Sequence, residues 1–189
     1  MPGRVETVGR TGGGDVSLAG MTDTTTADRY RRLAERFSAL VGDVPADGWR
    51  AASPCEGWTA RQVLDHVVDT SAGLLGRVDR APEVPDDDPV RRWAATRDAM
   101  QAAVDDPAVA GTEFDGFLGR STLAETVDGF MSPDLLVHTW DIARATGLEQ
   151  HEPMPAGAVG GVHARLASLG GAIVRRGGFG LEGRVPADA

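Results

Sequence analysis

Apolar residues recur at intervals of three and four positions in five segments of the chain, which is the spacing of one face of an α-helix. These segments are 26–42, 59–80, 89–105, 122–146 and 156–176. A short strand or hairpin is expected only at EFDGFLG, inside the connection 106–120. With no other strand alternation, the pattern predicts an all-α protein and excludes sheet-based α/β folds.

Local signals mark the ends of several predicted helices. Thr59 and Gln62 form a capping-box pattern at the start of the second helix. Gly147 is a suitable C-cap for the fourth helix, and a Pro- and Asp-rich break separates the second from the third. Helices joined by short to medium connections favour an antiparallel, up-down four-helix bundle, here with an additional C-terminal helix.

The first twenty residues differ from the rest of the chain. They are rich in glycine and lack any helical or strand period, and Met21 resembles a second start. We therefore expect residues 1–20 to be a disordered N-terminal extension. The chain has 189 residues, so residues 21–189 are expected to form one domain with a sizeable core.

Charge and cysteine content narrow the classes of partner. The formal net charge is −9 and every basic side chain is arginine. An acidic chain argues against nucleic acid, whose binding depends on basic surfaces, and against anionic membranes. The sequence has no apolar stretch long enough to span a bilayer. A single cysteine excludes an internal disulfide framework, so a cytoplasmic location is expected.

A polar stripe runs along the fourth predicted helix. At about 100° per residue, Asp134, His138 and Asp141 fall within one narrow arc, bordered on both sides by apolar residues. A stripe with such borders points into a core. Buried carboxylates and imidazoles are costly unless they are paired or bind a metal, so the stripe requires a partner.

His66, in VLDHVV on the second helix, is a candidate for that partner. With Asp134 and His138 it makes a two-histidine, one-carboxylate set for a divalent metal. Three protein ligands leave coordination positions open, as in catalytic sites. Zinc is expected, with nickel or iron as alternatives. Asp141 is expected to accept the N–H of a ligating histidine or to form a salt bridge. The plain alternative is a core histidine and an ordinary Asp–His helix pair.

Other candidate residues have weaker support. His163 is a possible fourth ligand, but nothing in the sequence pairs with it. His151 lies in a polar loop and is expected to be solvated. Cys55 precedes the second helix, where a thiol pKa can be lowered. However, no histidine neighbours it in sequence, so no residue is assigned a catalytic role.

Two blocks resemble a known family. The blocks SPCEGWTARQVLDHVV and DLLVHTWDIARATG are similar to those of the metal-binding, DinB-like proteins of actinobacteria. These proteins are related to the N-terminal domain of mycothiol-dependent maleylpyruvate isomerase. The resemblance covers roughly residues 26–186 and implies a DinB-like four-helix bundle whose metal triad is His66, Asp134 and His138. Many relatives have glutamate where this chain has Asp134.

The resemblance also implies a chemistry. The superfamily includes metal-dependent thiol S-transferases that use low-molecular-weight thiols such as mycothiol, so a thiol and a small electrophile are the expected partners of a monomer or homodimer. The isomerase has a further C-terminal domain, so maleylpyruvate isomerisation itself is not expected. The main alternative is a non-catalytic, metal-binding or stress-associated module. An iron oxygenase matches the ligand types but lacks its usual β-sandwich.

Overall fold

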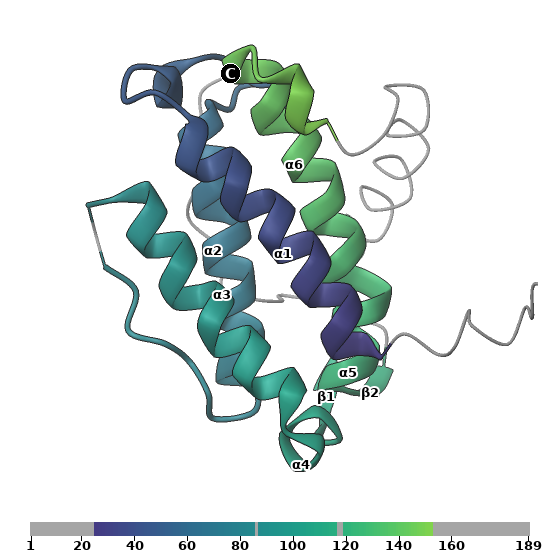
Figure 1. Cartoon of the computed structure of the whole chain (residues 1–189). Helices are drawn as coiled ribbons and strands as arrows, with labels where there is room; N and C mark the ends of the chain where they lie inside the picture. The colour runs from purple at the N-terminus through teal and green to yellow at the C-terminus, as the bar shows by residue number, and fades with distance from the viewer. Residues whose placement is uncertain (1–24, 86, 117–118, 153–189) are drawn as a thin grey trace, which may run out of the picture.

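Four long helices form the body of the part of the protein that the structure describes. The computed structural model describes residues 25–85, 87–116 and 119–152. The long helices are α1 (Thr26–Asp43), α2 (Ala60–Gly76), α3 (Pro89–Asp105) and α6 (Ser132–Thr146) (Figure 1). The prediction of an all-α, DinB-like bundle is confirmed. The predicted extension 1–20 and the predicted helix 156–176 lie outside the described residues.

Short elements lie between the long helices and after the last of them. They are η2 (Gly48–Arg50), α4 (Pro107–Ala110), β1 (Glu113–Gly116), β2 (Gly119–Thr122), α5 (Leu123–Thr126), η3 (Val127–Met131) and η4 (Glu149–His151). The two strands pair antiparallel, so the predicted strand or hairpin is confirmed. It lies at one end of the bundle, beside α4 and α5 (Figure 1).

The ends of α2 show where local sequence signals succeed and where they fail. At its start, Thr59 and Gln62 make both hydrogen bonds of the predicted capping box. At its other end the helix stops at Gly76, before the predicted Arg80. Asp79 takes a left-handed conformation with φ 56°, and the Arg80 N–H donates to the Leu75 carbonyl at 2.9 Å. This bond is typical of a Schellman motif, which usually carries glycine rather than aspartate.

The directions of the helices correct the simple up-down alternation. Helix α1 packs on α3 and α6, and α2 packs on the same two helices. Arg31 near the start of α1 pairs with Asp105 at the end of α3, so these two helices are antiparallel. Arg61 at the start of α2 reaches the Asp87 carbonyl just before α3, so α2 and α3 are parallel. The order is up, down, down, up, because connection 77–88 runs back along the bundle (Figure 1).

Arg92 ties this returning connection to the two parallel helices. Its side chain is 11% exposed, and its Nε lies 3.1 Å from Asp65 Oδ1. One terminal nitrogen donates to the Pro85 carbonyl at 2.9 Å, and the other lies 3.5 Å from Asp69 Oδ1. A single guanidinium therefore joins α2, α3 and the segment between them.

Replacing Arg92 with methionine should lower the free energy of unfolding by roughly 1–3 kcal/mol. The Pro85 carbonyl loses a charged donor, and Asp65 keeps Arg61 but loses Arg92, while the apolar stem is kept. Urea denaturation of both proteins measures the difference. Arg120→Met is the matched control: its pair with Glu113 is exposed on both sides, so its loss should leave stability unchanged. Equal stability of Arg92→Met and wild type would contradict a role for Arg92 in holding the connection.

A π-helical turn, η3, interrupts the predicted single helix 122–146. The Ser132 N–H donates to the Val127 carbonyl, five residues back, and Pro133 has no N–H to continue the α-helical ladder. The wider turn rotates less per residue than an α-helix, so apolar residues at every fourth position stay buried through it, namely Leu123, Val127, Met131 and Leu135. The rotation of α6 within the bundle, and with it the direction of the polar stripe, follows from this turn.

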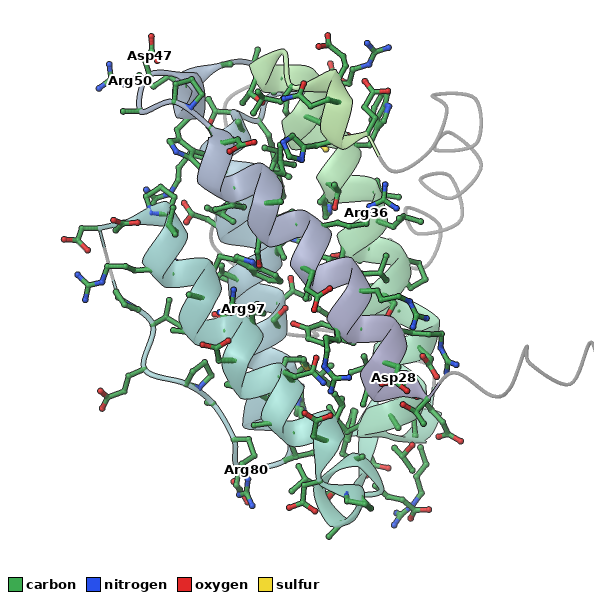
Figure 2. All side chains as sticks on the ribbon, in the orientation of Figure 1. Asp28, Arg36, Asp47, Arg50, Arg80 and Arg97 are labelled. Atoms are coloured by element: carbon green, nitrogen blue, oxygen red, sulfur yellow. The ribbon has the colours of Figure 1, made fainter. Side chains whose placement is uncertain are left out.

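Most of the buried side chains are apolar, and most charged side chains lie on the surface. Phe37 and Trp93 make an edge-to-face contact in the core with ring centroids 4.7 Å apart. Charged side chains such as those of Arg36, Asp47 and Arg80 extend away from the bundle (Figure 2).

Among the residues the structure describes, no helix has the length and apolar character needed to cross a membrane.

Candidate metal centre

The polar stripe of α6 meets His66 of α2 inside the bundle. Asp134 and His138 are 5% and 7% exposed. His138 Nε2 lies 3.4 Å from Asp134 Oδ1, and His66 Nε2 lies 3.9 Å from Asp134 Oδ2. The two imidazole rings are nearly perpendicular, with centroids 5.1 Å apart. The structure therefore brings together the three residues that the sequence predicts as ligands.

The backbone accounts for this convergence. Asp134 and His138 are four residues apart on α6, so their side chains share one face. Side chains on a helix lean toward its N-terminus, so in the antiparallel pair α2 and α6 the side chains of His66 and His138 lean in opposite directions along the bundle. Trp58, just before α2, lies edge-on to His66 with ring centroids 5.3 Å apart.

Asp141 holds the other nitrogen of His138. Its Oδ2 lies 2.8 Å from His138 Nδ1, and Asp141 is 2% exposed. A carboxylate only accepts hydrogen bonds, so Nδ1 carries the proton and Nε2 faces Asp134. Metal-binding histidines commonly have this partner on their second nitrogen.

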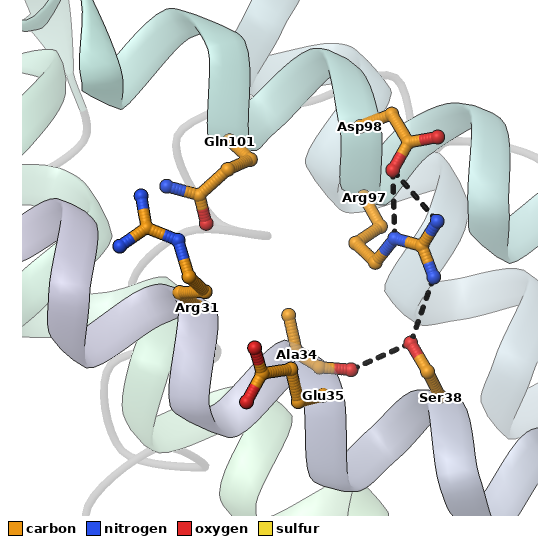
Figure 3. A pocket seen from close by; sticks show the side chains of 7 residues that line it. All are labelled: Arg31, Ala34, Glu35, Ser38, Arg97, Asp98 and Gln101. Atoms are coloured by element: carbon orange, nitrogen blue, oxygen red, sulfur yellow. Dashed lines mark hydrogen bonds and ion pairs between the residues drawn. The ribbon is translucent and has the colours of Figure 1, made fainter.

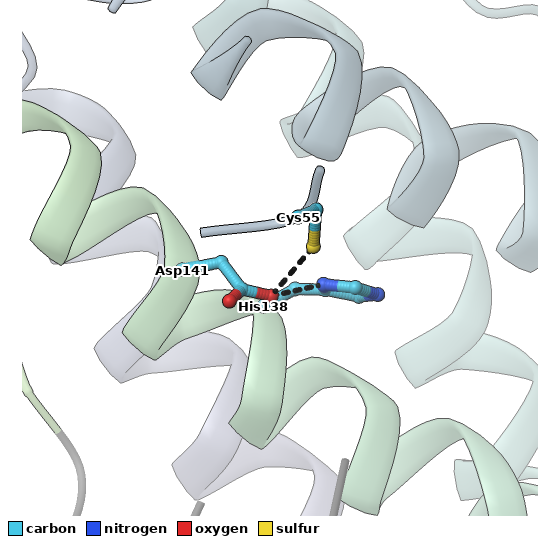
Figure 4. A group of neighbouring side chains, drawn as sticks. All are labelled: Cys55, His138 and Asp141. Carbon is cyan, nitrogen blue, oxygen red and sulfur yellow. Dashed lines mark hydrogen bonds and ion pairs between the residues drawn. The ribbon is translucent and has the colours of Figure 1, made fainter. Parts of the chain in front are cut away.

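Cys55 belongs to the same cluster, which the sequence analysis did not anticipate. Its Sγ lies 3.3 Å from Asp141 Oδ2, the oxygen that also accepts from His138 (Figure 4). The expectation that no histidine supports Cys55 considered only neighbours in sequence, whereas Asp141 is 86 positions away. Two groups of three residues with potential metal ligands therefore share His138.

Interatomic distances decide which group has room for an ion. Two ligands at about 2.1 Å from a tetrahedral ion lie about 3.4 Å apart. The donor atoms of His66, Asp134 and His138 are separated by such distances and all lie within 4.8 Å of one another. In the second group the Nδ1–Oδ2 separation of 2.8 Å is a hydrogen-bond length. The first group fits an ion, and the second is a hydrogen-bonded support.

The two histidines have opposite electrostatic environments. Burial lowers the pKa of His66 to about 4, and the neighbouring His138 adds to this effect against the attraction of Asp134. Burial also opposes protonation of His138. The charge of Asp134, together with hydrogen bonds to Asp134 and Asp141, outweighs it and raises the pKa of His138 well above 6.5. The pKa values of the two neighbouring imidazoles are therefore shifted in opposite directions.

The other candidate histidines lie elsewhere. His163 lies outside the described residues. His151 is 17% exposed and its Nε2 lies 2.8 Å from Asp43 at the end of α1, so the expectation that it is merely solvated is wrong. Its partner Asp43 is not one of the three candidate ligands, which makes His151 a useful control position.

A separate cavity of about 350 Å³ opens between α1 and α3 (Figure 3). Its lining residues all belong to these two helices, so it does not join the metal centre. Arg97 pairs with Asp98 at 2.7 Å and donates to Ser38, while Arg31 pairs with Asp28 and Asp105. The guanidinium groups of this cavity are already engaged in holding the two helices together.

Comparison with known proteins supports the resemblance drawn from the first of the two blocks, SPCEGWTARQVLDHVV. Residues 30–88 match the family model of the mycothiol maleylpyruvate isomerase N-terminal domain. This part of the chain is similar to that family. The match extends over most of α1 and all of α2 and includes His66, whereas Asp134 and His138 lie beyond it.

Two curated relatives of this chain come from Mycobacterium tuberculosis. They are the uncharacterized protein MT0763 of strain CDC 1551 / Oshkosh and the uncharacterized protein Rv0738 of strain ATCC 25618 / H37Rv. Each is 31% identical over 121 residues, which is 62% of this chain and 65% of the relative. The chain thus spans just under two thirds of the length of either relative. No solved structure matches.

Proposed function

We propose that the protein holds one divalent ion with His66, Asp134 and His138 and uses it in thiol chemistry. The proposed reaction is transfer of a low-molecular-weight thiol, such as mycothiol, onto a small electrophile, by a thiol S-transferase or isomerase-like enzyme. The supporting observation is the convergence of two imidazole nitrogens and one carboxylate oxygen within 4.8 Å. The relationship to a mycothiol-related family supports the choice of thiol.

The side chains have distinct roles in this proposal. A divalent ion would lower the pKa of a coordinated thiol and keep it as a thiolate nucleophile. His66, neutral because of its burial, offers a lone pair without losing a proton. Asp134 supplies negative charge, and Asp141 orients His138. Three protein ligands leave a position open for substrate. Zinc is favoured for this ligand set, with nickel and iron as alternatives.

A specific observation favours a second candidate, a non-catalytic metal-binding module. Around the three ligands, the described groups able to move a proton are Asp141 and Cys55, and both are hydrogen-bonded in support of His138. Such a site binds an ion without an evident acid or base for chemistry. Thiol consumption distinguishes the two candidates.

Metal content is the first test of the proposal. Elemental analysis of the purified protein, and of protein stripped with a chelator and reloaded with zinc, should find one ion per chain. A chain that retains no ion after reloading and buffer exchange would overturn both the enzyme and the binding module.

Metal affinity should fall as the pH falls. The proton on His138 Nε2 must leave before that nitrogen can bind an ion, and the pKa of His138 is raised. Below that pKa, each pH unit should weaken binding about tenfold, because one proton competes with each ion. Competition with a chromophoric chelator between pH 8 and pH 5.5 measures this slope. Constant affinity over that range would argue against histidine ligation.

The bundle should stay helical without metal and become more stable with it. The apolar core surrounds the site on all four long helices, so folding does not depend on the ion. An ion that binds only the folded state raises the free energy of unfolding by about 2.7 kcal/mol at one hundred times its Kd. Circular dichroism melts with chelator and with zinc measure both effects. A random-coil spectrum in chelator would make the ion structural instead.

A further inference from the structure

We propose that Cys55 is a positioning residue of the metal centre. Its thiol holds the Asp141 carboxylate in the orientation that fixes His138. The proposal rests on the proposed function, since His138 is a proposed ligand, but the contacts that carry it are present without metal. We call the hydrogen-bonded series of Cys55, Asp141 and His138 the Cys55 chain.

The Cys55 chain converges on one oxygen atom. Asp141 Oδ2 lies 3.3 Å from Cys55 Sγ and 2.8 Å from His138 Nδ1. A carboxylate oxygen only accepts, so both the S–H and the N–H donate to it. The opposite ring nitrogen, His138 Nε2, lies 3.4 Å from Asp134. A donor at one end of the chain thus orients a ligand nitrogen at the other.

The loop before α2 holds the thiol in place. The Ser53 N–H donates to the Trp58 carbonyl at 2.8 Å, and the Trp58 N–H donates to the Cys55 carbonyl at 3.0 Å. The Cys55 N–H donates to Ser53 Oγ at 3.1 Å. Gly57 takes φ 77°, which closes the turn and which residues with a side chain rarely adopt. This closed turn leads directly into α2, so it positions Cys55 relative to His66 as well.

The geometry indicates that Cys55 supports Asp141 and His138 and is not itself a ligand of the ion. The thiol and Asp141 lie on the Nδ1 side of the His138 ring (Figure 4), whereas Asp134 lies on the Nε2 side. An ion between His66, Asp134 and His138 therefore sits across the imidazole ring from the sulfur. For Cys55 to bind that ion, the hydrogen bond between Asp141 and His138 would have to break.

The affinity of the protein for cobalt(II) tests how much Cys55 and Asp141 contribute to positioning His138. Cys55→Ala should weaken binding about threefold to tenfold, the usual effect of one hydrogen bond. Cys55→Ser keeps a donor and should recover most of the loss. Asp141→Ala should weaken binding about tenfold to one hundredfold. In the Asp141→Ala background, Cys55→Ala should cause no further loss, because the thiol acts through that carboxylate.

The absorption spectrum of the cobalt-loaded protein shows whether Cys55 supports His138 or binds the ion itself. Wild-type protein with cobalt should lack the intense near-ultraviolet band of a thiolate bound to cobalt. A strong band that disappears in Cys55→Ala would overturn the proposal, because Cys55 would then bind the ion itself. Additive losses in the double variant would also overturn it.

The metal-free protein provides a readout independent of the proposed function. In nuclear magnetic resonance spectra, the His138 Nδ1–H proton should be shifted by its hydrogen bond and exchange slowly with water. In Cys55→Ala it should exchange faster, and in Cys55→Ser it should resemble wild type. If wild type binds no cobalt, the proposed function fails. The spectra of the metal-free protein then test by themselves whether Cys55 positions Asp141 and His138. If exchange and affinity in Cys55→Ala both match wild type, the proposal is overturned.

Discussion

Replacing His138 with alanine is expected to abolish stoichiometric metal binding. His138 supplies one of three proposed ligands and is the one residue common to the ion-sized group and to its hydrogen-bonded support. Its removal also leaves Asp141 without the imidazole that it contacts at 2.8 Å. His66→Ala should have a similar effect, since two remaining ligands from a single helix cannot hold the ion against exchange. Elemental analysis after gel filtration measures the loss.

His151→Ala is the matched control for this experiment. His151 also pairs with a carboxylate, Asp43, but lies outside the ligand group. It should keep one ion per chain. Circular dichroism should show that all variants remain helical, so that metal loss reflects the site and not unfolding. If His66→Ala and His138→Ala both retain full metal content, the assignment of the triad is wrong.

Thiol transfer should depend on the same residues. Zinc-loaded wild type is expected to consume mycothiol in the presence of a suitable electrophile, because an ion with an open position can hold the thiol as a thiolate. The His138→Ala variant, without its ion, should fall to the uncatalysed rate. This is the largest catalytic effect that the proposal predicts, since it removes the source of nucleophile activation.

The assay follows thiol loss with a panel of small electrophiles, at equal concentrations of wild type, His138→Ala and His151→Ala. His151→Ala should react like wild type. If wild type holds zinc but no member of a broad panel reacts faster than with His138→Ala, the enzyme interpretation fails. The non-catalytic metal-binding module then remains.

Helix positions were predictable because they depend on local physics. A period of 3.6 residues can be recognised from side-chain polarity alone, and α3 begins and ends where that period predicts. The capping box at Thr59 and the left-handed Gly147, with φ 71°, also follow from residue type. The end of α2 near Asp79 was missed because glycine usually occupies the left-handed position after a helix, and this chain has aspartate there.

The relative arrangement of the helices was less predictable. Hydrophobic stripes show which face of a helix is buried but not which neighbour covers it or in which direction it runs. The parallel pair α2 and α3 depends on contacts such as those of Arg92 with Asp65 and Pro85, which join residues distant in sequence. The π-helical turn η3 results from Pro133 and from the packing of every fourth residue around it.

The sequence by itself determined the helices, the inward polar stripe and the chemical character of the candidate ligands, because these depend on residue type and spacing along one element. Only the tertiary structure decided that His66 faces Asp134 and His138 across antiparallel helices at distances suited to an ion. It also decided that Cys55 shares an acceptor oxygen with His138. Hydrogen bonds and ligand distances depend on positions known to tenths of an ångström, and only the packing of distant segments sets those positions.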